Sequence, residues 1–312
     1  LGMLGMHGAG YTNRILEEVD LLVALGARFD DRATGKASEF CPRAAIAHVD
    51  ADAAEIDKIR TAHLGIVADV GEVLRALVPL VPRDERREWN ERTAELRARH
   101  PIFRRGGGGA FRPLDFLEHV ARRLAPETIV TTDVGQHQMW VAQAYPFRRP
   151  RTLLTSGGLG TMGFGLPAAI GAALAKPAAR VICVTGDGSF LMNVQELATL
   201  AELGLDVCVL VLDNRHLGLV RQQQELFYGR RFSASRFEAQ PDFAMIARAF
   251  GVEGIDLADE RDPLASLDRV LEARGPSLVR VPVPEDENVL PMVPPGAANR
   301  DMIEGGSHAR HD

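Results

Sequence analysis

GDGSFLMNVQELATLAELGLDVCVLVLDNRHLG, residues 186–218, decides the fold of this chain. Two apolar runs, residues 179–185 and 207–212, enclose a segment whose apolar residues recur at helical spacing. We therefore expect a buried strand, a helix and a second buried strand, and such a crossover makes the two strands parallel neighbours. Asp187 and Asn214 would then lie together at the carboxyl edge of the sheet, where ligands of such sheets bind.

The polar residues expected at this edge suit a metal-bound diphosphate. A carboxylate, a side-chain amide and a backbone carbonyl are the oxygen ligands that Mg2+ takes together with phosphate oxygens. Gly186 and Gly188 would let the backbone approach an anion, and a helix beginning near Ser189 would direct amide groups toward it. An ordinary Asp-Gly turn followed by a capped helix would give the same Gly186-Asp187-Gly188 pattern. The argument for a metal therefore depends on Asp213-Asn214 at the end of the next strand.

Composition and charge describe an ordinary globular protein of about two domains: 312 residues, 46% hydrophobic, with a net charge of -6. This mild acidity and the lack of a basic stripe interleaved with aromatics argue against nucleic acid as a partner. No apolar run approaches the ~20 residues that a membrane span needs. The three cysteines have no metal spacing, so we expect a reduced, cytoplasmic setting.

The pattern of apolar runs predicts an α/β fold with two doubly wound parallel-sheet domains. We expect a partial first domain at 1–82, a linker with a charged helix and a four-glycine run at 83–112, a second domain at 113–284, and a tail at 285–312. Expected strands are 20–25, 44–49 and 64–67 in the first domain, and 128–132, 152–155, 179–185, 207–212 and 277–281 in the second. Expected helices are 85–99, 114–124, 164–174, 190–201, 243–250 and 263–272.

Two glycine-containing patterns have other interpretations. Residues 158–163 read G-x-G-x-x-G between a strand and a helix, and Asp187 would supply the acid of a dinucleotide fingerprint. That interpretation leaves the turn around Gly188 and the later Asn214 unexplained. In the first domain, Gly26, Asp50 and Asp69 follow strands, as residues of a nucleotide site or of ordinary turns do.

Several separated motifs resemble the catalytic large subunit of acetolactate synthase (acetohydroxyacid synthase), a thiamine diphosphate-dependent family. They are SGGLGTMGFGLPAAIGA at 156–172, DVGQHQMW at 133–140, GDGSFLMNVQELATL at 186–200, GLV and LFY within 218–228, and MVPPGAAN at 292–299. LGMLGMHG at 1–8 and GARFDDR at 26–32 are similar to the flavin-binding middle domain of that family. The resemblance covers nearly the whole chain.

The resemblance implies a set of residues for thiamine diphosphate and Mg2+. The metal would be held by Asp187, the Asn214 side chain and the backbone carbonyl of His216. Met162 would be the apolar wedge that bends the cofactor, and the Gly160 carbonyl would meet its aminopyrimidine. Further cofactor contacts would come from Val134, Gly135, Gln136, His137, Gly186, Gly188, Ser189, Leu217 and Gly218.

The resemblance also implies a structural FAD in the first domain. Its contacts would be Leu4, Gly5, Met6, His7, Gly26, Ala27, Arg28, Asp30, Arg32, Asp50 and Asp69. The implied reaction decarboxylates pyruvate and ligates the two-carbon unit to a second 2-keto acid, giving 2-acetolactate or 2-aceto-2-hydroxybutyrate for branched-chain amino acids. At least a homodimer and a small regulatory subunit are implied as partners.

Two departures from the family pattern change these expectations. Gln223 stands where the family has a tryptophan that shapes the pocket for the second keto acid, so little preference for 2-ketobutyrate over pyruvate is expected. The glutamate that activates the cofactor lies on an amino-terminal domain of the family, so no catalytic residue is expected in these 312 residues and the chain by itself should be inactive. Another thiamine diphosphate-dependent decarboxylase or carboligase, and a non-catalytic cofactor-binding relic, stay as alternatives.

Overall fold

The computed structural model describes residues 1–102 and 111–305, and these form two compact units. Of the described residues, 1–102 and 290–305 belong to one unit, and 111–289 belong to the other. The four-glycine run of the expected linker lies outside the described residues. The expected domain boundaries stay predictions.

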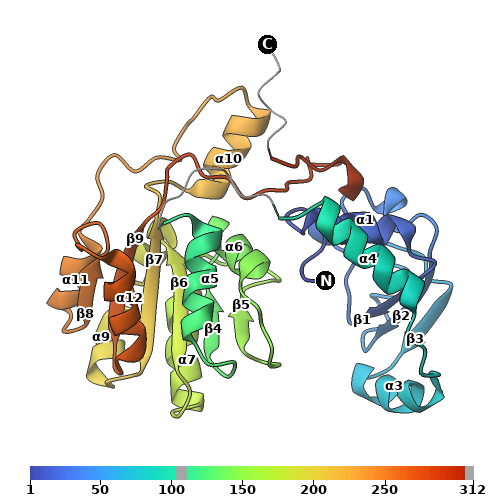
Figure 1. The fold of residues 1–312 in the computed structure, drawn as a ribbon, viewed down its shortest axis with the longest axis horizontal. Helices are drawn as coiled ribbons and strands as arrows, with labels where there is room; N and C mark the ends of the chain where they lie inside the picture. Colours follow the sequence, from blue (N-terminus) through green and yellow to red (C-terminus); the bar gives the residue numbers. More distant parts are fainter. Residues whose placement is uncertain (103–110, 306–312) are drawn as a thin grey trace. The chain divides into compact units, whose positions relative to one another are not determined.

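The second unit is built on a six-stranded, wholly parallel sheet (Figure 1). At its centre β6 pairs with β7 in a register that sets Gly186 opposite Leu212, so both strands end at the same edge. The predicted parallel pair is therefore confirmed. The strand order is β5 (Leu153–Thr155), β4 (Ile129–Thr132), β6 (Val181–Gly186), β7 (Val207–Asp213), β9 (Ser277–Pro282) and β8 (Glu253–Asp256).

Helices cover both faces of this sheet. Successive strand residues point to opposite sides, and because the residues on both sides are apolar, both faces must be covered. Ile182 and Val184 face one core, which is completed by α5 (Pro113–Arg123), α6 (Gln136–Ala144) and α12 (Pro263–Glu272). Val181 and Cys183 face the other, which is completed by α7 (Gly165–Ala175), α9 (Glu196–Glu202) and α11 (Phe243–Ala249). The doubly wound arrangement is confirmed. No helix in the described ranges is both long and apolar enough to cross a membrane.

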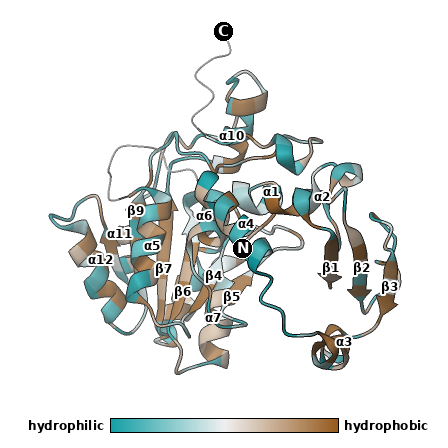
Figure 2. Cartoon of the chain, turned by 45° about the vertical axis from the view of Figure 1, so that its right-hand side comes forward, coloured by the Kyte–Doolittle hydropathy of each residue, from teal (hydrophilic) through white to brown (hydrophobic). Residues whose placement is uncertain are grey.

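The first unit carries a three-stranded parallel sheet in the order β1 (Leu21–Leu25), β2 (Ala45–Asp50) and β3 (Leu64–Val67), matching the three expected strands. Figure 2 shows that these strands are largely apolar. Phe29, Phe40 and Ile46 belong to its small core, whereas Leu21, Val23 and Leu25 are exposed. Its helices are α1 (Gly10–Glu18), α2 (Asp31–Thr34), α3 (Val70–Leu77) and α4 (Arg87–Arg99), with short 3-10 turns at Ala37–Glu39 and Val78–Leu80.

Residues 290–305 are part of this first unit. The Val293 backbone N–H donates to the Met6 carbonyl at 2.9 Å, and Asn299 Nδ2 donates to the Ala33 carbonyl at 2.9 Å. A 3-10 turn at Asn299–Asp301 and a bridge between Met292 and Ile303 give the segment local order. Chain from the far end of the sequence thus stabilises the fold near its start.

The expected helix at 190–201 was wrong as one element. It is divided into α8 (Asp187–Phe190), a 3-10 turn (Leu191–Asn193) and α9. Helices α1, α2, α3, α6 and α10 (Gly218–Phe227) and strand β8 were not anticipated. Apolar periodicity could not reveal α6 or α10, because the side chains they bury include Gln136, His137, Arg221 and Gln222.

Phe190 connects the core to the candidate site, because it is 2% exposed and its ring meets Phe243 edge to face at a centroid distance of 5.7 Å. We expect Phe190→Ala to lower the free energy of unfolding by about 3–5 kcal/mol, since a buried phenyl group and its contacts are lost. Denaturant unfolding followed by circular dichroism measures this. Phe232→Ala is the control, because Phe232 is 47% exposed; equal losses in the two variants would contradict the prediction.

Candidate functional site

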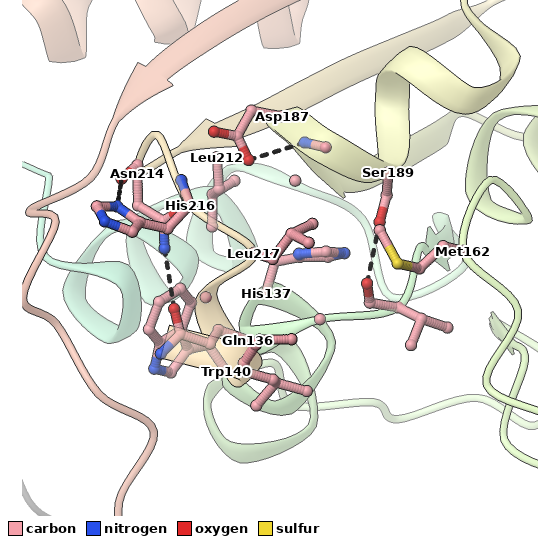
Figure 3. A pocket seen from close by; sticks show the side chains of 17 residues that line it. Gln136, His137, Trp140, Met162, Asp187, Ser189, Leu212, Asn214, His216 and Leu217 are labelled. Atoms are coloured by element: carbon pink, nitrogen blue, oxygen red, sulfur yellow. Dashed lines mark hydrogen bonds between the residues drawn. The ribbon is translucent and has the colours of Figure 1, made fainter. Parts of the chain in front are cut away.

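The carboxyl edge of the central sheet brings the expected metal ligands together. Asp187 begins α8 directly after β6, and Asn214 follows the last residue of β7. Both side chains are buried, at 2% and 6% exposure. They line one cavity of about 130 Å3 together with His216 (Figure 3). The strand pairing therefore places the carboxylate and the amide at a shared cavity, as the sequence predicted.

Most of the cofactor residues expected from the resemblance line the same cavity. Gly160 is not among the lining residues; it adopts φ +64° in the loop before α7, and its Cβ position would be 3.9 Å from Val134. The residues that were expected and do line the cavity are Val134, Gly135, Gln136, His137, Met162, Gly186, Asp187, Gly188, Ser189, Asn214, His216, Leu217 and Gly218. Trp140, Leu212, Leu219 and Val220 line it as well and were not anticipated.

Asp187 shares a hydrogen-bond donor with a second buried carboxylate. Gln240 Nε2 donates to Asp187 Oδ2 at 2.6 Å and to Asp213 Oδ1 at 2.8 Å. Arg280 pairs with Asp213 Oδ2 at 2.8 Å on its other side. Burial, with the nearby Asp213 adding to it, raises the pKa of Asp187 to about 8. A divalent cation would oppose this shift, because its positive charge favours the ionised carboxylate.

Asn214 has its amide oriented by neighbours. Its Nδ2 donates to Gln136 Oε1 at 2.9 Å, while its Oδ1 accepts from the His216 backbone N–H at 3.1 Å. The His216 ring in turn lies 2.8 Å from the Asn214 carbonyl oxygen. This loop is held in place because the Leu217 N–H donates to the Ser235 carbonyl at 2.8 Å.

The opposite wall of the cavity is made of glycines packed against His137. A Cβ on Gly186 would lie 2.9 Å from His137 Nδ1, and a Cβ on Gly135 would lie 2.7 Å from His137 Cε1. His137 Nε2 is buried with no hydrogen-bond partner in the described residues. Burial lowers the pKa of His137 to about 4, against the opposing effect of Asp133. A neutral imidazole with an unused buried nitrogen is suited to an incoming polar ligand.

Asp133, which the sequence reasoning did not assign to the site, explains why the glycine pattern at 158–163 is not a dinucleotide fingerprint. Its carboxylate accepts from the Gly163 N–H at 2.8 Å and from the Gly165 N–H at 3.0 Å. The amide groups that a pyrophosphate would use at the start of α7 are thus already bonded to a protein carboxylate. The geometry therefore does not favour the dinucleotide interpretation.

Gln223, expected at the pocket for the second keto acid, lines a separate surface groove. The groove is also lined by Gln224, Tyr228 and Arg231. Leu219 and Val220 line both this groove and the cavity, so the two are adjacent along α10.

The residues expected to contact FAD lie in three places in the first unit. Gly26, Asp50 and Asp69 are at the carboxyl edge of the sheet, where the Gly26 N–H donates to the Val49 carbonyl at 2.8 Å. Leu4, Gly5, Met6 and His7 form a loop against α2, with the Met6 N–H donating to the Arg32 carbonyl at 2.7 Å. Ala27, Arg28 and Asp30 connect β1 to α2, and Arg28 pairs with Asp30 at 3.3 Å.

Some of these residues already have structural roles. Asp30 caps α2 by accepting from the Arg32 and Ala33 N–H groups, and Asp69 caps α3 by accepting from the Glu72 N–H. A Cβ on Gly5 would lie 2.1 Å from the Arg32 carbonyl, so only glycine fits there. His7 is buried, and its pKa is lowered to about 4, chiefly by that burial. These roles are compatible with flavin contacts but do not depend on them.

Comparison with known proteins assigns both units. Residues 133–281 match the thiamine pyrophosphate enzyme C-terminal TPP-binding domain, and residues 1–77 match the thiamine pyrophosphate enzyme central domain. The chain is 52% identical over 303 residues to the acetolactate synthase isozyme 1 large subunit of Escherichia coli, covering 97% of the chain. The chain belongs to the acetolactate synthase large-subunit family.

Other relatives agree. The isozyme 2 large subunit of Escherichia coli is 47% identical over 97% of the chain, and the acetolactate synthase large subunit of Parasynechococcus marenigrum is 46% identical over 99%. The chain covers 54%, 55% and 50% of these three proteins, so it spans about half the length of the curated relatives it matches. The family suspected from the sequence motifs is thus confirmed.

The cavity fits the diphosphate end of this cofactor. His137 Nε2, which has no hydrogen-bond partner among the described residues, is a polar atom that a phosphate oxygen could contact, and the Asp187 and Asn214 oxygens are suitable Mg2+ ligands. Among the described residues, no group of three or more His, Cys, Asp or Glu could hold a metal. The expected ligand set differs from such a group, because it uses one carboxylate, one amide and one backbone carbonyl.

Sequence reasoning missed the residues that hold the ligands in place. Gln240 lies in a polar loop with no periodicity, and Gln222 lies within a run of three glutamines. Asp133 was visible at the end of a predicted strand, and this position was the one available signal for its role. The polar residues at strand ends were thus sufficient to predict the residues that would contact the cofactor and metal. The side chains that hydrogen-bond to those residues could not be recognised in the sequence.

We expect His137 to make the chain less stable as pH falls from 6.5 toward 4, because unfolding then exposes an imidazole that takes up a proton. Buried His7 acts in the same direction and Asp187, whose pKa is raised, acts in the opposite one, so the contribution of His137 is measured as a difference between variants. The folded protein keeps this imidazole neutral until pH approaches 4, so its contribution is present above 6.5 and is lost on acidification. In His137→Gln the number of protons taken up on unfolding in this window should fall by about one. Denaturant unfolding at a series of pH values measures it, and an unchanged pH dependence would count against the prediction.

Proposed function

We propose that this chain binds thiamine diphosphate and Mg2+ as part of an acetolactate synthase. Such an enzyme decarboxylates pyruvate and joins the two-carbon unit to a second 2-keto acid, giving 2-acetolactate or 2-aceto-2-hydroxybutyrate for isoleucine and valine biosynthesis. The observation that carries the proposal is the shared cavity of Asp187, Asn214 and the glycine wall, within a TPP-binding domain. When bound, thiamine diphosphate supplies the electron sink for decarboxylation and the nucleophilic carbon for ligation.

The residues of this chain would bind and orient that cofactor. Asp187, Asn214 and the His216 carbonyl would hold Mg2+, whose remaining ligands would be diphosphate oxygens. His137, Ser189 and the backbone at Gly188 would contact the phosphates. Ser189 is already placed, because its Oγ donates to the Val134 carbonyl at 3.0 Å across the cavity.

The apolar lining has a separate task. Met162, Leu212 and Leu217 would pack on the cofactor and keep water away from its reactive carbon. Gln223 would face the second keto acid from the adjacent groove, where a polar side chain smaller than tryptophan should weaken selection for the larger 2-ketobutyrate.

FAD, the assembly and the location of the protein are further parts of the proposal. The carboxyl edge around Gly26 and Asp50, with the loop around His7, would hold a structural FAD. Relatives are named large subunits, which supports a small regulatory subunit as a partner, and we propose at least a homodimer. The three free thiols, all buried, are compatible with a cytoplasmic location.

Activation of the cofactor needs a carboxylate that the cavity does not provide. Among the described residues that line it, Asp187 is the sole carboxylate, and its proposed role is to bind Mg2+. In the family the activating glutamate belongs to an amino-terminal domain. We therefore propose that the 312 residues bind the cofactor without turning it over, and that catalysis requires a glutamate supplied from outside them.

The cofactor site can be tested directly by binding. In calorimetric titrations of the purified chain with MgCl2 at saturating thiamine diphosphate, we expect Asp187→Asn to weaken Mg2+ binding by at least roughly tenfold, because an anionic ligand is lost. Asp259→Asn makes the same charge change at an exposed position and should bind as the unaltered chain does. Equal affinities for Asp187→Asn and the control would remove the metal from the proposal.

The catalytic requirement has its own assay. Pyruvate, thiamine diphosphate, Mg2+ and FAD mixed with the purified 312-residue chain should yield no 2-acetolactate above a protein-free blank. Adding the amino-terminal part of a relative in trans, with its glutamate, should produce some turnover, and the glutamate-to-glutamine form of that part should not. Formation of 2-acetolactate by the chain alone would show that the activating group lies within these residues.

A further inference from the structure

Three buried amide side chains connect the candidate metal ligand to a backbone segment near the end of the second unit. Asn214 Nδ2 donates to Gln136 Oε1 at 2.9 Å, and Gln136 Nε2 donates to Gln222 Oε1 at 3.0 Å. Gln222 in turn pairs with the backbone of Val289, accepting from its N–H at 2.8 Å and donating to its carbonyl at 2.9 Å. We refer to Asn214, Gln136, Gln222 and the Val289 backbone as the amide relay.

The relay has a fixed direction. A carboxamide can turn over and exchange its oxygen and nitrogen, but a backbone N–H can only donate and a backbone carbonyl can only accept. The two hydrogen bonds to Val289 therefore determine which atom of Gln222 is the oxygen. That oxygen requires a donor from Gln136, whose own oxygen must then face Asn214 Nδ2. Asn214 Oδ1 is then the atom that accepts from the His216 N–H at 3.1 Å, and its second lone pair is left for a ligand in the cavity that Asn214 lines.

The backbone segment that anchors the relay, residues 287–289, makes further hydrogen bonds. Gln136 Nε2 also donates to the Glu287 carbonyl at 2.9 Å, which independently fixes its nitrogen. Arg221, 5% exposed, bonds the Asn288 side chain, and Asn288 Nδ2 donates to Glu225 at 2.9 Å. Glu287 is thus bonded to α6, and Asn288 and Val289 are bonded to α10, so the backbone to which the relay is anchored is held at several points.

The relay is also sterically confined. A Cβ on Gly218 would lie 2.0 Å from Gln136 Oε1 and 2.8 Å from Asn214 Nδ2. Gln222 is fully buried, Gln136 is 3% exposed, and Gln222 is not among the residues that line the cavity. In so closed a space a reversed amide would set donor against donor and find no water to repair the loss.

We propose that Gln222 is a positioning residue for Mg2+: together with the Glu287 carbonyl it fixes Gln136, and Gln136 together with the His216 N–H holds Asn214 with the oxygen, and not the nitrogen, available to the cation. The inference rests on the proposed function, because it requires that Asn214 bind the metal. The nitrogen of a carboxamide carries two hydrogens, and its lone pair is delocalised into the carbonyl and is not offered to a hard cation, so the orientation of Asn214 decides whether it is a ligand.

The test compares substitutions at 222 that do and do not keep an oxygen toward Gln136. Gln222→Met preserves volume but removes the relay, and we expect Mg2+ affinity at saturating thiamine diphosphate to fall about tenfold. Gln222→Glu keeps an acceptor for Gln136, and its protonated carboxyl can donate to the Val289 carbonyl, so its affinity should stay close to that of the unaltered chain. Gln195→Met, at an exposed position, is the matched control.

Calorimetric titration with MgCl2 gives the affinities, and thermal unfolding without metal checks that each variant folds cooperatively. If Gln222→Met does not fold, Gln222→Ser removes the amide without adding bulk and is expected to show the same loss. A Met or Ser variant that binds Mg2+ as tightly as the unaltered chain would overturn the inference, and so would a folded Glu variant as weak as the Met variant. In both cases the proposed function would stand, whereas an unaltered chain that binds no Mg2+ would overturn both.

Discussion

The parallel pairing of β6 with β7 is the constraint on which the site depends. Because Gly186 is opposite Leu212, the two residues that follow these strands arrive at one edge with no room for a shift in register. A slip of β7 by one residue would turn Leu210 from one core to the other and would shift Asn214 relative to Asp187. The apolar pattern that buries the strands therefore also sets the distance between the candidate metal ligands.

Placing two carboxylates at this edge has an electrostatic cost that neighbouring residues reduce. Asp213 is balanced by Arg280, which also pairs with Asp256, and Gln240 donates to both Asp187 and Asp213. Without a cation, burial still favours the protonated form of Asp187. Hydrogen bonds therefore hold the site in shape, but the ionised Asp187 carboxylate is balanced only when a cation binds.

The sequence was sufficient for the central strands and for the first contacts, because both follow from periodicity and from what stands at strand ends. Val181–Gly186 and Val207–Asp213 are largely apolar, as strands covered on both faces are. Helices α6 and α10 were not predictable in the same way, since they bury Gln136 and Gln222, whose partners are set by tertiary structure. For the same reason, the hydrogen bonds from Gln240 to Asp187 and Asp213 could not be predicted. Hydrophobic periodicity indicates which faces of an element are apolar. It does not reveal polar side chains that are buried and hydrogen-bonded.

Gly218 shows how tightly these polar groups restrict one another. The Gln136 carboxamide occupies the space that a Cβ at position 218 would need. This carboxamide in turn hydrogen-bonds to Asn214 and Gln222. A larger residue at 218 could be accommodated only if position 136 became smaller, and that change would remove the hydrogen bonds of Gln136 to Asn214 and Gln222. Positions 136, 214, 218 and 222 should therefore change together over evolutionary time, although position 136 is far from the other three in the chain.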